Sequence, residues 1–190
     1  MDTNLNTNPL PITEISQRGL DEIKAAEGFV PHLYKDPVGI VTIGYGHAVS
    51  DPKTGKMLRD DVGMQRAKEL FPHPLSVVEA EELLKKDLKK FEQQVFDYTK
   101  TASYVNQEMF DALVSFQYNT GSLKGSTLLK KFLAGDLKAA ALEFSKWVFG
   151  TDNSGKKVKL PGLVNRRNRE MLMFLEGVDK KEKNTNHAKN

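Results

Sequence analysis

The chain has 190 residues, of which 39% are hydrophobic and 28% charged, a composition typical of a globular protein with one domain or two lobes. It has no cysteine, which excludes disulfides, thiolate metal sites and cysteine nucleophiles, and no apolar run approaches the roughly 18 residues that span a bilayer. The net charge of +3 is uneven, because residues 150–190 carry ten Lys and Arg against five Asp and Glu. This basic end favours anionic partners, although a solvated face explains any single lysine equally well.

Both ends of the chain are predicted to be disordered. Residues 1–11 are rich in Asn, Thr and Pro, and residues 178–190, VDKKEKNTNHAKN, form a basic tail with almost no apolar content. The first residues lack the basic flank and apolar stretch of a secretory signal, so we expect the protein to begin in the cytoplasm. A single folded domain of two lobes is expected over residues 12–177.

The first half of this domain mixes helix and strand. A helix is predicted over residues 16–27 and ends at Gly28. The runs HLYKD and IVTIGY, separated by residues 37–39, predict a hairpin with a three-residue loop. A turn near residues 51–55 is expected to lead to a short third strand near Met57, followed by a short helix over residues 61–70.

A long helix is predicted next. Ser76 and Glu79 have the spacing of a capping box, and apolar residues then recur at helical spacing as far as Tyr98. A helix of about 23 residues would be roughly 35 Å long, enough to connect two lobes.

The remaining elements are predicted to be helices. They cover residues 106–118, 126–134, 136–148 and 161–176, and a polar, basic loop fills residues 150–162. Trp147 falls on or beside an apolar stripe, which favours a core position over a platform for sugars. The predicted architecture is α+β, with a small lobe containing a short antiparallel sheet, a long connecting helix and a larger helical lobe.

Glu27 has an unusual position at the end of the first predicted helix. It continues the apolar stripe of Leu20 and Ile23, and it lies at the helix C-terminus, where the macrodipole disfavours a carboxylate. Both features are expected to raise a carboxyl pKa, as a general acid near neutral pH requires. A glutamate that turns into water explains the same position, so this feature alone does not decide.

The predicted hairpin brings two further polar groups together. A loop of residues 37–39 pairs Asp36 with Ile40, and Tyr34 then lies opposite Thr42. Asp36 and Thr42 therefore project from one face as diagonal neighbours, roughly 7–8 Å apart. A carboxylate and a hydroxyl so placed can hold a water, and a second carboxylate opposite a general acid is what glycoside hydrolysis requires. Taken singly, Asp36 is an ordinary turn residue and Thr42 an ordinary strand residue.

These residues resemble the catalytic triad of the phage endolysin lysozymes, glycoside hydrolase family 24. Eight residues separate Glu27 from Asp36, five separate Asp36 from Thr42, and IGYGH follows. The similarity continues through EAEELLKKDL, FDALVSFQYNTG and GLVNRRNRE, and so covers nearly all of the folded chain. It implies a lysozyme-like fold with a cleft between the lobes. It also implies a muramidase that cleaves the β-1,4 bond between N-acetylmuramic acid and N-acetylglucosamine in peptidoglycan.

The resemblance also implies a role for each residue. Glu27 is similar to the general acid, Asp36 to the carboxylate that positions water or stabilises charge at the sugar, and Thr42 to its water-holding partner. Gln117 is similar to a substrate-contacting glutamine, and Arg166 to an arginine that pairs with the catalytic glutamate. A guanidinium beside Glu27 would lower its pKa, against the apolar and dipole effects.

Partners and location are predicted from the residues and from this resemblance together. We expect a monomer that needs no cofactor or metal, because the histidines lack the i, i+4 pairing of helical zinc sites. We expect no nucleic acid, no membrane anchor, and release by a holin from the host cytoplasm to the cell wall. Two alternatives stay open: a lytic transglycosylase, which needs one carboxyl only, and a non-enzymatic basic protein that binds the wall or nucleic acid.

Overall fold

The computed structural model describes residues 11–151 and 155–187, with side chains as far as residue 184. The chain divides into two compact units. The sheet unit is Gln17–Phe91, and the helical unit combines the residues up to Ser16 with those from Glu92 onward. Residues 1–10 of the predicted disordered N-terminus, and residues 188–190 of the tail, lie outside the described part.

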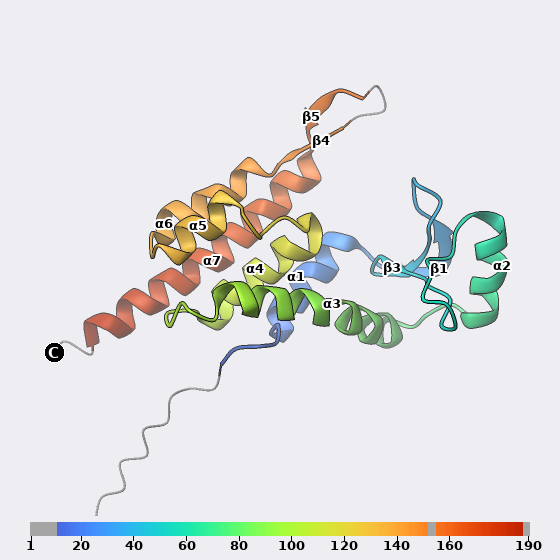
Figure 1. Cartoon of the computed structure of the whole chain (residues 1–190), viewed down its shortest axis with the longest axis horizontal. Coiled ribbons are helices and arrows are strands. Elements are labelled where there is room, and N and C mark those ends of the chain that lie inside the picture. The colour runs from blue at the N-terminus through green and yellow to red at the C-terminus, as the bar shows by residue number, and fades with distance from the viewer. Residues whose placement is uncertain (1–10, 152–154, 188–190) are drawn as a thin grey trace, which may run out of the picture. The chain divides into compact units, whose positions relative to one another are not determined.

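The sheet unit mixes helices and strands, as the sequence predicts (Figure 1). In chain order these are α1 (Gln17–Glu27), β1 (Val30–Lys35), β2 (Val41–Gly44), β3 (His47–Ala48), α2 (Asp60–Leu70) and the first part of α3 (Val77–Thr99). The strands form an antiparallel sheet in the order β1-β2-β3. Val41, Ile43, Val49 and Ala67 form its buried core, against which partly buried leucines and Phe71 pack.

The predicted third strand is wrong. The third strand of the structure is His47–Ala48, directly after a turn at Tyr45 and Gly46. Met57 makes only an isolated bridge to Ser50. The chain reverses direction directly after β2 because the glycines on either side of Tyr45 adopt positive φ, Gly44 at 69° and Gly46 at 83°. The sequence stretch IGYGH therefore encodes a tight hairpin.

The capping box at the start of α3 is confirmed. The amide of Glu79 donates to Ser76 Oγ at 3.2 Å, and the Ser76 amide donates back to Glu79 Oε2 at 2.8 Å. The helix has 23 residues, as predicted, and its sequence belongs to both units.

The helical unit is built around α4 and α7. Its elements are the end of α3, α4 (Gln107–Thr120), α5 (Thr127–Leu133), α6 (Leu137–Glu143), the 3-10 helix η1 (Phe144–Lys146), β4 (Phe149–Thr151), β5 (Lys157–Lys159) and α7 (Pro161–His187). Side chains of Asn106, Ser126 and Asp136 cap α4, α5 and α6. The core includes four buried phenylalanine rings in sequential contact, with neighbouring centroids 5.5–5.9 Å apart: Phe116, Phe144, Phe174 and Phe132.

The helix predicted over residues 136–148 and the loop predicted over 150–162 need correction. The helix ends at Glu143 and continues as one 3-10 turn, and part of the supposed loop is a hairpin in which Phe149 pairs with Lys159. The Lys157 ammonium lies 5.0 Å from the centre of the Phe149 ring, and Leu160 packs tightly against Gly150. These few apolar contacts stabilise two strands in a segment whose polar composition predicts a loop.

The predicted disordered tail is wrong for residues 178–187. Helix α7 continues through Gly177 to His187, and the side chain of Val178 is only 2% exposed. Gly177 does not end the helix: its carbonyl accepts a hydrogen bond from Asn106 Nδ2 at 2.7 Å, and a Cβ there would lie 2.5 Å from Asn106 Oδ1. This glycine permits a close approach of α7 to the start of α4.

We expect the end of α7 to stabilise the fold, so removing residues after 177 should lower the melting temperature rather than leave it unchanged. Val178→Ala should reduce the free energy of unfolding by about 2 kcal/mol, and the melting temperature by roughly 4–8 °C. Leu172→Ala is the matched control, because Leu172 lies on the same helix but is 57% exposed. Calorimetry that gives equal melting temperatures for the two variants would contradict the docked tail.

Candidate active site

Glu27 is the last residue of α1, in the sheet unit. Leu20 and Ile23, on the stripe that leads to it, are 2% and 0% exposed, whereas Glu27 itself is half-buried. Gly28 follows with φ 76°, and its amide donates to the carbonyl of Lys24 at 3.0 Å. The left-handed glycine ends the helix at this residue.

The turn that carries Glu27 is braced from one side. The Lys24 ammonium bonds Glu81 Oε2 at 2.6 Å, which raises the pKa of Lys24 and lowers that of Glu81. The same ammonium lies 5.7 Å from the centre of the Tyr45 ring, and Tyr45 packs on Phe29 with ring centroids 5.4 Å apart. The last turn of α1 is therefore fixed to α3 and to the hairpin.

Asp36 is held rigidly by the hairpin loop. Its Oδ1 accepts the amides of Val38 at 2.9 Å and Ile40 at 2.8 Å, and its own amide donates to the Ile40 carbonyl at 2.9 Å. The predicted three-residue loop and its closing pair are thus confirmed. The second oxygen, Oδ2, accepts no hydrogen bond from any residue in the described part of the chain. One carboxylate oxygen fixes the side chain and the other is available to a ligand.

Thr42 lies beside Asp36 in the register that the sequence predicts. Tyr34 and Thr42 are cross-strand partners, so Asp36, two residues after Tyr34, shares their face. Thr42 is 5% exposed, and its hydroxyl donates to the Ile40 carbonyl at 3.2 Å. With its proton committed, the Thr42 oxygen can only accept a further hydrogen bond.

Gln117 and Arg166 belong to the helical unit. Gln117 is 3% exposed: its amide nitrogen donates to Gln94 Oε1 and its oxygen accepts the amide of Leu123, both at 2.8 Å. The Arg166 guanidinium donates to Glu170 Oε1 at 3.2 Å and to the Ser115 carbonyl at 3.3 Å. These bonds hold both side chains in place, and their predicted roles toward substrate and Glu27 stay predictions.

A charged cluster that was not predicted from the sequence surrounds Arg166. Glu170 is 4% exposed, and one of its oxygens accepts bonds from Arg166, Arg167 and the Ser115 hydroxyl. Burial raises the pKa of Glu170, against the two guanidiniums. The Arg167 guanidinium also lies 5.0 Å from the centre of the Phe116 ring. A glutamate three and four residues after two arginines was the available signal.

The family model for phage lysozyme matches residues 24–170, a span that includes all five predicted site residues. The chain belongs to the phage lysozyme family. Among its relatives, the endolysin of Bacillus phage B103 is 40% identical over 173 residues, and the endolysin of Salmonella phage P22 is 32% identical over 164 residues. These alignments cover 87% and 85% of this chain. It spans only 56% of the length of the B103 protein, but 98% of the P22 protein.

Solved structures agree with this family. The muramidase domain of SpmX from Asticcacaulis excentricus superposes with a TM-score of 0.68 at 29% identity, over 85% of this chain and 97% of that one. The predicted lysozyme-like α+β fold is therefore confirmed.

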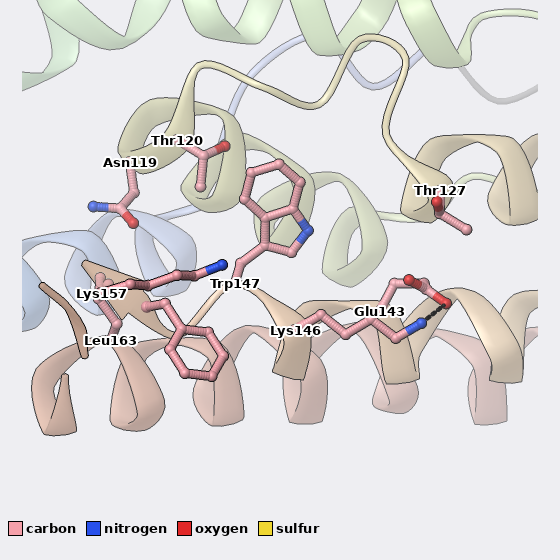
Figure 2. Close-up of a pocket in the computed structure, with 9 residues that line it drawn as sticks. Asn119, Thr120, Thr127, Glu143, Lys146, Trp147, Lys157 and Leu163 are labelled. Carbon is pink, nitrogen blue, oxygen red and sulfur yellow. Dashed lines mark hydrogen bonds and ion pairs between the residues drawn. The ribbon is translucent and has the colours of Figure 1, made fainter. Parts of the chain in front are cut away.

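The helical unit of this phage lysozyme family member has a cavity of about 620 Å³ (Figure 2). Its lining combines aromatic rings, hydroxyl and amide groups, and charges: Asn119, Thr120, Thr127, Glu143, Lys146, Trp147, Phe149, Lys157 and Leu163. The expectation that Trp147 belongs to the core is confirmed only in part. Its ring packs edge-on against Phe116 at 5.2 Å, but the side chain is half-buried and forms one wall of the cavity.

Glu143 in this wall is an ion-paired carboxylate. It is 3% exposed and bonds the ammonium groups of Lys131 and Lys146, which lowers its pKa, the bond from Lys131 being the larger cause. Across the described residues, His, Asp and Glu side chains form no group of three that could hold a metal ion. No helix in the same part of the chain is long and apolar enough to span a bilayer.

Proposed function

We propose that this chain is an endolysin that hydrolyses the β-1,4 bond between N-acetylmuramic acid and N-acetylglucosamine in peptidoglycan. The observation that carries the proposal is the state of Asp36: Oδ1 is fixed by two backbone amides, and Oδ2 is left open on the strand face that Thr42 shares. Membership of the phage lysozyme family supports the same reaction.

In this proposal Glu27 is the general acid. Glu27 lies at the end of a helix that the Lys24–Glu81 ion pair holds in place. The carboxyl group that protonates the leaving glycosidic oxygen is therefore positioned by the fold. Gly28 ends the helix there and lets the chain turn into β1, and Asp36 follows directly after this strand.

Asp36 and Thr42 orient the attacking water. The Thr42 oxygen accepts one hydrogen of the water because its own proton is given to Ile40, and Asp36 Oδ2 accepts the other. Both hydrogens are then held by acceptors, so the water directs a lone pair at the anomeric carbon. Asp36 takes the proton as the bond to the sugar forms, which is the work of a general base.

A water held in this way implies inversion at the anomeric carbon. Inverting enzymes leave about 6.5–9.5 Å between their carboxyl groups, against roughly 5–5.5 Å where a carboxylate attacks directly. We expect NMR of the first-formed product to show the α anomer. A dominant β anomer would mean that Asp36 or another group bonds the sugar covalently.

Mass spectrometry of the muropeptides released from purified sacculi tests the reaction itself. Hydrolysis leaves a reducible N-acetylmuramic acid end, whereas a lytic transglycosylase leaves an anhydro sugar and has no use for a water-holding pair. A protein that only binds the wall or nucleic acid releases nothing. Only reducible ends support the proposal.

Gln117 and Arg166 are proposed to act from the helical unit, Gln117 on the glycan and Arg166 on Glu27. What supports this is that each side chain is fixed by partners within its own unit, so either can act without being ordered first. The ring of bonds from Glu170 and Ser115 gives Arg166 its orientation.

For delivery, we propose that the protein folds as a monomer in the host cytoplasm and reaches the wall through a holin. A chain without cysteine folds equally well in the reducing cytosol and outside the membrane. Induction without a holin should leave culture turbidity unchanged until chloroform opens the inner membrane. Prompt lysis by the active form alone would oppose passive delivery.

A further inference from the structure

Tyr34 is a polar side chain of the sheet unit that has no role in the reaction proposed above. It is the cross-strand partner of Thr42, and it precedes Asp36 by two residues on β1 and its extension into the loop. Side chains at i and i+2 of a strand, and those of direct cross-strand partners, project from one face of a sheet. The phenol therefore stands on the face that carries Asp36 and Thr42.

The hydroxyl of Tyr34 has no hydrogen-bond partner among the described residues, although its ring is half-buried. Tyr104 in the helical unit differs, since its hydroxyl donates to the Phe132 carbonyl. The Tyr34 hydroxyl is not one of the buried polar atoms that lack a partner in the described residues, so solvent, and therefore a ligand, can reach it. The Tyr34 hydroxyl is thus a donor that the fold does not use.

Burial and nearby negative charge keep this donor protonated. Burial raises the pKa of Tyr34, and the negative charges of Asp36 and Glu27 raise it further. The phenol therefore interacts electrostatically with both carboxylates, although Glu27 and Asp36 are nine positions apart in the chain. A neutral O–H among carboxylates can donate to a ligand oxygen across the whole pH range in which an acid and a base of this kind operate.

We propose that Tyr34 is a further substrate-contacting residue, whose hydroxyl donates a hydrogen bond to an oxygen of the sugar unit that undergoes cleavage. The inference rests on the proposed muramidase function and adds a third side chain to the strand face of Asp36 and Thr42. The hydroxyl bonds neither carboxylate in the described structure, so it remains available to the sugar. A sugar ring supplies hydroxyl, ring and acetamido oxygens as acceptors.

Tyr34→Phe tests this contact, because it removes one hydroxyl and keeps the ring. We expect kcat/KM on purified peptidoglycan to fall by about 10-fold or more, the cost of leaving a substrate acceptor without its donor. The melting temperature should stay within about 1 °C of the wild type, since no hydrogen bond within the protein is lost. Tyr98→Phe is the matched control: Tyr98 is also half-buried, but it lies on α3 in the helical unit.

Binding provides a second readout that does not depend on turnover. In the Glu27→Gln background, calorimetry with a purified glycan fragment should show affinity that falls by a similar factor when Tyr34→Phe is added. Unchanged kcat/KM and unchanged glycan affinity for Tyr34→Phe, with an active wild type, would overturn the inference. A wild type that does not cleave peptidoglycan would instead overturn the proposed function.

Discussion

Glu27→Gln is expected to leave the fold intact and to reduce the clearing of purified cell walls by at least the roughly 10²–10⁴-fold that a positioned general acid supplies. Glutamine has nearly the same shape as glutamate, so it preserves the end of α1 and the turn at Gly28. It carries no proton that it can give to the leaving oxygen. Without that proton the leaving group would depart as an alkoxide, which is the step the acid exists to avoid.

The matched control for this variant is Asp21→Asn. Asp21 lies on the same helix, its carboxyl is largely exposed, and it bonds Lys24. The substitution therefore removes one negative charge from this helix and leaves Glu27 unchanged. We expect Asp21→Asn to clear walls at close to the wild-type rate. A Glu27→Gln protein that does the same, with an unchanged melting temperature, would show that the acid is another residue.

The elements that the sequence predicts well are those fixed by neighbours in the chain. The loop at residues 37–39 closes through the amides of Val38 and Ile40, and the capping box of α3 joins Ser76 to Glu79. Such bonds join residues at most four positions apart, so composition and spacing reveal them. The three residues of the candidate triad lie on this local framework, within residues 27–42 of the sheet unit.

The elements that the sequence misses depend on partners far along the chain. Polar residues dominate the end of α7, and its contacts reach residues far along the chain: Val178 is buried, Asn106 bonds Gly177, and Lys180 and Glu182 pair with Glu108 and Lys138. The strands β4 and β5 are similar, because one aromatic ring and one leucine support them. The polar composition of these segments is typical of a loop. They form a helix and strands because tertiary contacts offset the loss of chain entropy, and the sequence pattern does not reveal those contacts.

The same distinction applies to the candidate site. Tyr34 could be placed beside Asp36 from strand alternation alone, but its lack of a protein partner needs coordinates. The carboxyl of Glu170 bonds Ser115, 55 positions earlier, and no spacing in the sequence announces that contact.

Asp36→Asn is expected to lower the rate of wall hydrolysis by roughly 10²–10³-fold, the effect of losing a positioned base. Two backbone amides must still find an acceptor, so the side-chain carbonyl of the new asparagine is expected to take the place of Oδ1, which keeps the hairpin. Its NH₂ group then occupies the position of Oδ2. An amide there donates where the water needs an acceptor, and it cannot take the proton as the new bond forms.

Asp51→Asn is the control for this variant, because Asp51 Oδ1 also accepts two backbone amides of a turn in the sheet unit, those of Lys53 at 2.8 Å and Thr54 at 3.1 Å. Its other oxygen bonds Arg66 at 3.1 Å, so Asp51→Asn changes an ion pair and a turn but no oxygen on the strand face of Thr42. We expect it to lose some stability and to keep its activity. Turnover measured by new reducing ends should separate the two variants by about two orders of magnitude. If Asp36→Asn keeps more than half of the wild-type turnover, Asp36 does not hold the water, and a base must be sought elsewhere while Glu27 remains the acid.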